Sequence, residues 1–178
     1  KRATLRRFAA LGAASPLAGV ASASDEESDS DAPDAITGYL SATPGAHFSK
    51  IRDDLKLGTG ETQYHLRGLQ EKGVIESRRD GDYRRFFSAG RFDEFQQVAL
   101  GTLRRETPRK MLIALLVGDY SPAEIADRVG VSRPTVSKHA TTLEKAGLLA
   151  REPEYAVVEP ETVLVLLVRY ADSFGEDA

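Results

Sequence analysis

Short polar and cationic side chains recur between residues 133 and 141 at a spacing that suits one face of a helix. Such groups can bond to base edges and neutralise phosphates, which is the chemistry needed to read duplex DNA. The residues that we assign to DNA binding here are Arg133, Pro134, Thr135, Ser137, Lys138 and Thr141. Lys145 continues the polar side, while Val136, Ala140 and Leu143 form an apolar stripe with a 3.6-residue period. The segment therefore predicts a helix that buries one side and presents the other to DNA.

A second candidate face lies nearer the N-terminus. The residues that we assign to DNA binding in it are Thr59, Gln63, Tyr64 and Arg67. The amide of Gln63 suits adenine, and the guanidinium of Arg67 suits guanine or a phosphate. Glu61 and Glu71 lie beside them and are less favourable to a duplex. The two faces therefore need not read the same sequence, and it stays open whether both contact DNA.

Four arginines flank a tight turn after the second face. They are Arg78, Arg79, Arg84 and Arg85, and we assign all four to DNA binding. Asp80-Gly81 between two runs of strand-forming residues predicts a two-residue hairpin turn. Arginines on such a wing suit phosphates or the minor groove beside a recognition helix. The alternative is a solvated hairpin whose charges serve solubility.

Capping and turn residues must position the face at 133–141. The run Ser121-Pro122-Ala123-Glu124 is a capping box with proline in the first turn, so it predicts a helix start. Gly130 permits a sharp turn because glycine takes positive φ without penalty, and Ser132 can cap the next helix. Gly147 ends that helix before a second wing. This wing carries one cation and two carboxylates over 151–154, so we expect it to be short and to contribute weakly.

The chain contains an internal repeat. Shifted by 74 residues, SKIRDDLKLGTGETQYHLRGLQEKGVI at 49–75 aligns without a gap with AEIADRVGVSRPTVSKHATTLEKAGLL at 123–149. Matching positions carry the same residue types, such as His65 with His139 and Gly73 with Gly147. A repeat of this size indicates two similar small domains.

The expected fold class is mainly α with small β-hairpin wings, built as two tandem winged helix-turn-helix domains plus linking and C-terminal helices. The expected helices are 34–42, 49–55 and 60–72 in the first domain and 108–117, 122–129 and 134–146 in the second. Periodic apolar residues predict a connecting helix within 92–107. The division is 1–34, a basic and apolar segment with an acidic linker; 35–91, the first winged domain; 92–107, the connecting helix; 108–159, the second winged domain; and 160–178, a C-terminal helix.

Two stretches resemble known regulators. The run SPAEIADRVGVSRPTVSKHATTLEKAGLL at 121–149 is similar to the helix-turn-helix core of ArsR and MarR type regulators. Residues 44–87 resemble the winged-helix domains of archaeal, especially haloarchaeal, regulators that contain two helix-turn-helix domains. The resemblance covers 35–170 and implies sequence-specific DNA binding and transcriptional regulation. It does not extend to the N-terminal segment.

Composition excludes several other kinds of site. The sequence holds no cysteine, which rules out disulfides, thiolate catalysis and cysteine-based zinc sites. His47, His65 and His139 are the only histidines and form no close pair, so we expect no metal site. His65 and His139 lie at matching positions of the repeat, and we expect each to make a structural hydrogen bond. No serine lies in a nucleophile elbow and no glycine-rich loop carries a phosphate-binding lysine. We therefore expect no enzymatic activity and no cofactor, although a net charge of −3 means that local cations must carry DNA binding.

The N-terminal segment allows several readings. Residues 1–23 combine a basic start with an apolar stretch and small residues, a layout typical of a signal peptide. A disordered basic arm, an amphipathic surface helix and loose membrane anchoring are the alternatives. Neither export nor anchoring is favoured, because a DNA-binding chain must act in the cytoplasm. Residues 22–34 are polar and acidic, which predicts a disordered linker.

The apolar run Val163–Val168 is too short to span a membrane, so it is either core for the second domain or a dimer seam. The expected partners are double-stranded DNA and a second copy of the chain. The expected location is the cytoplasm, with membrane association through residues 1–23 as a minor alternative. The alternative functions are a winged-helix module for protein interaction and a membrane-tethered regulatory module.

Overall fold

The structure of the protein is a computed structural model that describes residues 27–175, with side chains from residue 31 onward. Helices make up most of this range and two small antiparallel sheets lie among them, so the predicted fold class is confirmed. In chain order the elements are α1 (Glu27–Ala42), β1 (Ala46–His47), α2 (Phe48–Leu55), α3 (Thr59–Glu71), β2 (Ile75–Asp80), β3 (Tyr83–Ser88), α4 (Glu94–Leu103), α5 (Glu106–Val117), α6 (Pro122–Val129), α7 (Arg133–Lys145), β4 (Leu149–Ala150), β5 (Ala156–Val157), α8 (Pro160–Tyr170) and the 3₁₀ helix η1 (Ala171–Ser173).

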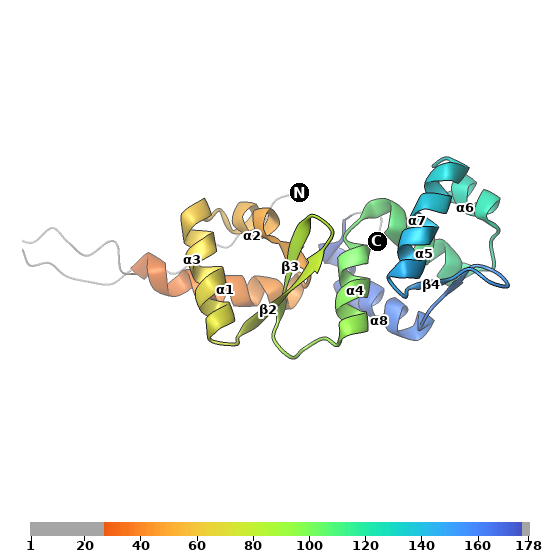
Figure 1. Ribbon diagram of the computed structural model, residues 1–178. Helices are drawn as coiled ribbons and strands as arrows, with labels where there is room; N and C mark the ends of the chain where they lie inside the picture. The colour runs from red at the N-terminus through yellow and green to blue at the C-terminus, as the bar shows by residue number, and fades with distance from the viewer. Residues whose placement is uncertain (1–26, 176–178) are drawn as a thin grey trace, which may run out of the picture.

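The internal repeat reappears in the boundaries of these elements. α2, α3 and β2 begin at residues 48, 59 and 75, and α6, α7 and β4 begin at residues 122, 133 and 149. Each element of the second unit thus begins 74 residues after its counterpart in the first. Figure 1 shows the two units side by side along the length of the molecule. The tandem arrangement is therefore the one that the sequence predicts.

The first unit packs α1, α2 and α3 around a small apolar core. Its buried side chains are Ile36, Leu40, Ala46, Ile51, Leu66, Leu69, Ile75 and Phe86. A three-stranded antiparallel sheet in the order β1-β3-β2 closes one edge of this core. The short strand β1 is an addition to the predicted hairpin, and it joins the sheet where Ala46 pairs with Phe86.

The β2–β3 hairpin turns one residue later than the sequence predicts. Asp80 pairs with Tyr83 at the end of the ladder, so Gly81 and Asp82 form the turn instead of Asp80-Gly81. Gly81 takes a φ of 60°, the left-handed conformation that a tight hairpin turn needs. The shift makes Asp80 a strand residue, and its carboxylate consequently belongs to a face of the sheet.

β3 divides its side chains between two cores. Phe86 is buried in the core of the first unit, and the next residue, Phe87, is buried in the core of the second. Neighbouring residues of a strand point to opposite faces, so both faces of the hairpin are covered near its base. The adjacent phenylalanines indicate this burial in the sequence itself, because a hairpin with one face in solvent would place only one of the two side chains in a core.

The second unit packs α5, α6 and α7 together with α4 and α8. Ala99, Leu100 and Leu103 of α4 are fully buried, and Val163 and Leu167 of α8 are buried in the same core. The predicted connecting helix exists as α4, but it forms part of the second core. The second wing is as short as predicted, because β4 and β5 have two residues each.

The first helix begins earlier than the sequence predicts. A disordered linker over 22–34 is wrong for its described part, because α1 is helical from Glu27 onward. Ala32 and Ile36 are buried and lie four residues apart, on one face of the helix. The acidic composition that favours a linker is also compatible with the first turns of a helix, where the dipole favours carboxylates.

Within residues 27–175, no helix is both long enough and apolar enough to cross a bilayer. The basic and apolar segment 1–23 lies outside the described residues. The hypotheses that this segment is a signal peptide, a basic arm, a surface helix or a membrane anchor therefore stay predictions.

Gly101 and Gly68 provide a matched test of the packing between the units. A Cβ at Gly101 would lie 3.0 Å from Arg85 Cδ and 3.3 Å from Asp80 Oδ2, whereas a Cβ at Gly68 meets nothing within 4 Å. Glycine to alanine in a helix interior ordinarily stabilises by about 1 kcal/mol. We expect Gly68→Ala to raise the melting temperature and Gly101→Ala to lower it, because the buried Arg85 has little room to move. Calorimetry of both variants measures this, and a higher melting temperature for Gly101→Ala would contradict it.

Candidate nucleic-acid interface

Local caps set the direction in which α7 leaves the core. The backbone N–H of Glu124 donates to Ser121 Oγ at 3.4 Å, and the Glu124 carboxylate accepts from the Ser121 N–H at 2.9 Å. The predicted capping box is therefore present. Gly130 ends α6 with a φ of 74°, and Ser132 Oγ accepts from the Thr135 N–H at 3.3 Å to begin α7. These contacts form the helix-turn-helix of the second unit.

α7 buries its apolar stripe and leaves the predicted DNA-binding face in solvent. Val136, Ala140 and Leu143 are buried. The assigned residues that are exposed on the other side are Arg133, Pro134, Ser137 and Lys138. Thr135 and Thr141 are half-buried. Thr141 Oγ1 donates to the Ser137 carbonyl at 3.0 Å and accepts from Arg151 Nη1 at 3.2 Å. The Thr141 hydroxyl therefore already has two hydrogen-bond partners within the protein.

The corresponding face of α3 is also exposed, and it contains an ion pair. The assigned residues Thr59, Gln63, Tyr64 and Arg67 are all solvent-exposed, and 70% of Tyr64 is accessible. Arg67 Nε donates to Glu71 Oε1 at 2.9 Å on the same helix. A phosphate that approaches Arg67 must therefore compete with the carboxylate that the sequence already marks as unfavourable.

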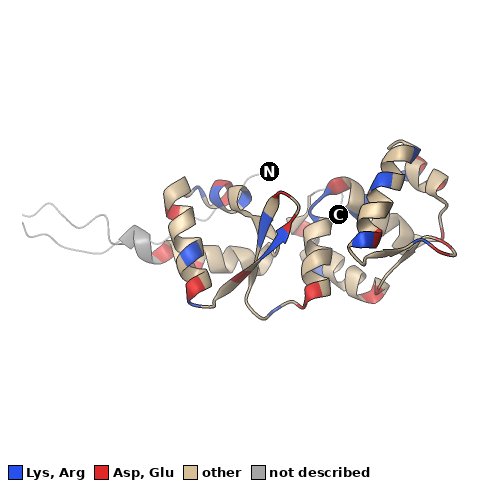
Figure 2. Ribbon diagram, viewed as in Figure 1, with Lys and Arg blue, Asp and Glu red and all other residues tan. Residues whose placement is uncertain are grey.

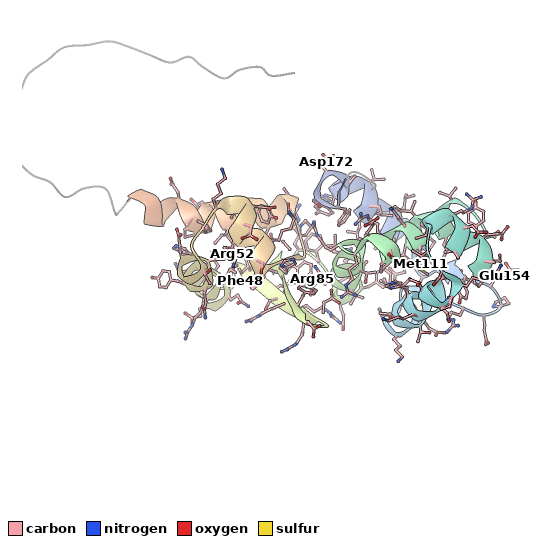
Figure 3. All side chains as sticks on the ribbon, turned by 90° about the horizontal axis from the view of Figure 1, so that it is seen from above. Phe48, Arg52, Arg85, Met111, Glu154 and Asp172 are labelled. Atoms are coloured by element: carbon pink, nitrogen blue, oxygen red, sulfur yellow. The ribbon has the colours of Figure 1, made fainter. Side chains whose placement is uncertain are left out.

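Both helices and the β2–β3 hairpin lie on one side of the molecule. In Figure 1 α3, the hairpin and α7 lie toward the viewer, and α8 lies behind them. Figure 3, seen from above, agrees, because the hairpin and α7 lie on the lower side of the molecule in this view while α1 and Asp172 lie on its upper side. Figure 2 shows Lys and Arg on the hairpin strands and along α7. We call the side that carries α3, the hairpin and α7 the reading side.

Three of the four wing arginines reach the surface of the hairpin. Arg79 and Arg84 are exposed, and Arg84 Nε donates to Ser77 Oγ at 2.8 Å. Arg78 is half-buried, and its Nη1 donates to Glu94 Oε1 of α4 at 3.1 Å. Arg79 and Arg84 are therefore the wing cations most accessible to a phosphate.

Arg85 is buried, which corrects its assignment to DNA binding. Only 4% of its side chain is exposed. Its Nε donates to Asp80 Oδ2, and its Nη1 donates to the Gly45 carbonyl at 3.0 Å. Alternation along β3 explains the burial, because Arg85 shares a face with Phe87, and α4 covers that face. Arg85 therefore holds the hairpin in place from within.

Asp80 binds two arginines that come from different units. One carboxylate oxygen accepts from Arg85 of the hairpin, and the other accepts from Arg105, the residue before α5. Burial alone would raise the pKa of Asp80, but the hydrogen bonds and charges of Arg85 and Arg105 outweigh it and hold that pKa below its ordinary value. The carboxylate is thus ionised at neutral pH and ties the hairpin to the second unit. Sequence reasoning missed this role because it placed Asp80 in the turn.

Arg104 makes a second connection between the first unit and the second, because it contacts both the loop before β1 and the C-terminal end of the described chain. Its Nη2 donates to the Pro44 carbonyl at 2.7 Å and to Ser173 Oγ at 3.0 Å, and its guanidinium carbon lies 4.8 Å from the centre of the Phe174 ring. Burial lowers the pKa of Arg104 to about 10, so it remains charged at neutral pH. We call the set Asp80, Arg85, Arg104 and Arg105 the joint.

The three histidines belong to three different elements. His47 caps the start of α2 through its Nδ1, and His65 is buried in α3. His139 is half-buried on α7, where burial and then the charges of Lys138 and Arg105 lower its pKa, so that it is neutral at pH 7. In the part of the chain that the structure describes, no group of three His, Cys, Asp or Glu side chains could hold a metal ion.

Each of the two units matches a known protein family. Residues 30–100 match a family described as an N-terminal helix-turn-helix domain, and residues 111–156 match the MarR family. The chain is a DNA-binding regulator with two helix-turn-helix domains. Domains of these two kinds are typical of regulators that are not enzymes. No curated protein matches the regulator closely enough to count as a relative.

Arg84 and Arg85 of this regulator are neighbours in sequence with opposite expected roles. Arg85→Ala removes one partner of a buried ion pair, so we expect the free energy of unfolding to fall by roughly 3 kcal/mol. Arg84→Ala removes an exposed side chain, so we expect a change within about 0.5 kcal/mol. For DNA, Arg84→Ala should reduce the salt dependence of binding, since the slope falls by about 0.9 for each phosphate that is no longer neutralised.

Urea unfolding of both variants and binding titrations of Arg84→Ala over a range of salt concentrations measure these effects. A stable Arg85→Ala would show that the buried pair is dispensable. An unchanged salt slope for Arg84→Ala would remove Arg84 from the interface.

Proposed function

We propose that the protein binds specific sites in double-stranded DNA and thereby regulates transcription. α7 and α3 lie in the major groove in this proposal, and the β2–β3 hairpin contacts the backbone or the minor groove. The observation that supports it best is the position of all three elements on the reading side of two units held together by the joint. Phosphate contacts would position the protein, and contacts to base edges would specify the site.

We assign the main reading role to α7. Pro134 and Ser137 are small and exposed, so the helix can approach base edges closely, and Lys138 supplies a cation that reaches a base or a phosphate. No carboxylate forms an ion pair with Lys138 within the described residues. A contact to DNA from Lys138 therefore displaces no carboxylate of the described residues.

α3 has a supporting role in this proposal. Gln63 and Tyr64 are free to meet bases or sugars, whereas Arg67 must first leave Glu71. An exposed ion pair of this kind contributes at most about 1 kcal/mol, so its rearrangement costs little. The negative charge of Glu71 would still lie beside the duplex, however, and would repel its phosphates. We therefore expect α3 to bind DNA less strongly than α7.

The joint supports one composite site for each chain. Asp80, Arg85, Arg104 and Arg105 connect the units through buried or half-buried charged groups, so the two recognition helices keep a constant separation. A duplex bound by both helices would then carry two contacted segments at a fixed spacing. This function requires the protein to act where the chromosome lies, which we take to be the cytoplasm.

We also propose that the protein is a homodimer through α8. Val163, Leu166 and Leu167 are buried, but Leu164, Val165 and Val168 are 50%, 60% and 72% exposed. Val165 lies midway in sequence between Glu161 and Arg169, which are both exposed. An antiparallel pair of α8 helices with its two-fold axis at Val165 would therefore place Glu161 of each copy near the partner's Arg169. A symmetric dimer would read two copies of the site related by a two-fold axis.

The DNA-binding proposal predicts the effect of substitutions on α7. Lys138→Ala and Ser137→Ala should each weaken binding to a selected site by roughly 1–3 kcal/mol where the side chain touches a base, without changing the melting temperature. Selection from a random duplex pool supplies the site, and titration at one fixed salt concentration measures the affinity. Lys110→Gln removes one positive charge from α5 at a residue that belongs to neither proposed reading face, and it serves as the control. Unchanged affinity in both α7 variants would remove α7 as the reading helix.

The dimer proposal predicts a charge-reversal rescue. Glu161→Arg alone places two cations together at each end of the helix pair, and Arg169→Glu alone places two carboxylates there, so each should produce a monomer. The double variant restores opposite charges and should restore the dimer. Sedimentation equilibrium at micromolar concentration measures the masses, and a monomeric wild-type chain would refute the proposal.

A further inference from the structure

A groove separates the hairpin of the first unit from the recognition helix of the second. Its volume is about 640 Å³. The hairpin wall carries Arg78 and Arg79, the α7 wall carries Thr142 and Lys145, and α4 forms the floor with Phe95 and Val98. Because the hairpin and α7 both belong to the reading side, the groove lies between two elements that the proposed function places against DNA.

The charges in this groove favour an anion. Five cationic side chains line it against two carboxylates, Asp80 and Glu94. Both carboxylates already bind arginines, since Asp80 accepts from two members of the joint and Glu94 accepts from Arg78. Arg79 and Lys145 at the rim are exposed and carry no ion pair in the part of the chain described. The described residues therefore leave two cations available on opposite walls.

The α7 wall continues the predicted DNA-binding face. Lys138, Thr142 and Lys145 lie at intervals of four and three residues, which places them along one line of the helix. A strand of backbone that passes Lys138 would meet Thr142 and Lys145 next. A free anion would need only one cluster of donors, whereas these cations are spread along the helix and across the groove. That spacing suits a chain of phosphates.

We propose that this groove holds the sugar-phosphate backbone of the duplex as it passes from one recognition helix to the other. The inference rests on the proposed function and deepens it, because it assigns Lys145, Thr142 and Arg79 to one backbone segment between the two read segments. The two units then bind one continuous duplex instead of two separate ones. The sequence does not predict this groove, because its walls come from different units.

The absence of cysteine permits a direct test of proximity. Thr142→Cys, Ser137→Cys and Asp172→Cys each introduce one thiol that can carry an iron chelate, which cuts nearby backbone by hydroxyl radicals. Thr142 lies in the groove, Ser137 on the exposed face of α7, and Asp172 on the opposite side of the molecule. Each conjugate is added at a concentration that saturates the duplex, because Ser137 belongs to the proposed reading face and its replacement weakens binding. We expect the Thr142→Cys conjugate to cut between the two contacted segments, the Ser137→Cys conjugate to cut within one of them, and the Asp172→Cys conjugate to leave the DNA intact.

Salt titrations test the same assignment without a label. Lys145→Gln and Arg79→Gln should each lower the slope of log affinity against log salt by about 1. Lys110→Gln removes the same charge outside the groove and should leave the slope unchanged. An equal decrease for Lys110→Gln would mean that the effect follows net charge, which would overturn the assignment to the groove.

The outcomes separate this inference from the proposed function. If the Ser137→Cys conjugate cuts a bound duplex and the Thr142→Cys conjugate does not, the groove is empty of DNA while the function stands. If the wild-type chain binds no duplex at any salt concentration, the function and the inference both fail. If inorganic pyrophosphate protects the Thr142→Cys thiol from alkylation and the duplex does not, the groove takes a small anion and the inference is overturned.

Discussion

The carboxylate of Asp80 accepts hydrogen bonds from Arg85 and Arg105, and the relation between the two units depends on it. Removing charges from water is costly, and the cost is recovered only when the partners bind with good geometry. Both oxygens of Asp80 are used, and Arg85 also donates to a carbonyl of the first unit. These contacts fix the hairpin against the second unit, so the hairpin, the groove and α7 keep a defined arrangement.

Much of the fold can be predicted because its signals are local. The limits of α6 are the predicted ones, since a capping box begins it and a glycine ends it. The 74-residue repeat carries the same pattern to α2 and α3. The exposed faces of α3 and α7 follow from helical periodicity alone. The start of α1 is not predicted, because an acidic composition suits both a linker and the first turns of a helix.

Within the candidate site, the sequence predicts least well which of several like side chains are exposed and which are buried. Arg84 and Arg85 look equivalent in sequence, yet one is exposed and the other is buried. The difference depends on α4, which lies over one face of the hairpin and is distant from the turn signal that Asp80-Gly81 gives. The net charge of the sequence likewise does not predict the local charge of the groove. The sequence is acidic overall, but the two carboxylates in the groove are bound by arginines, so its local charge is positive.

The adjacent residues Phe86 and Phe87 bear on how the chain folds as well as on how it packs. One strand contributes to both hydrophobic cores, so neither core can be completed while that strand is unfolded. Although the two halves repeat one pattern of elements, they are therefore not independent folding units. Cutting the chain between the halves would expose apolar surface on each fragment. Heat or denaturant should accordingly unfold both halves in a single cooperative transition.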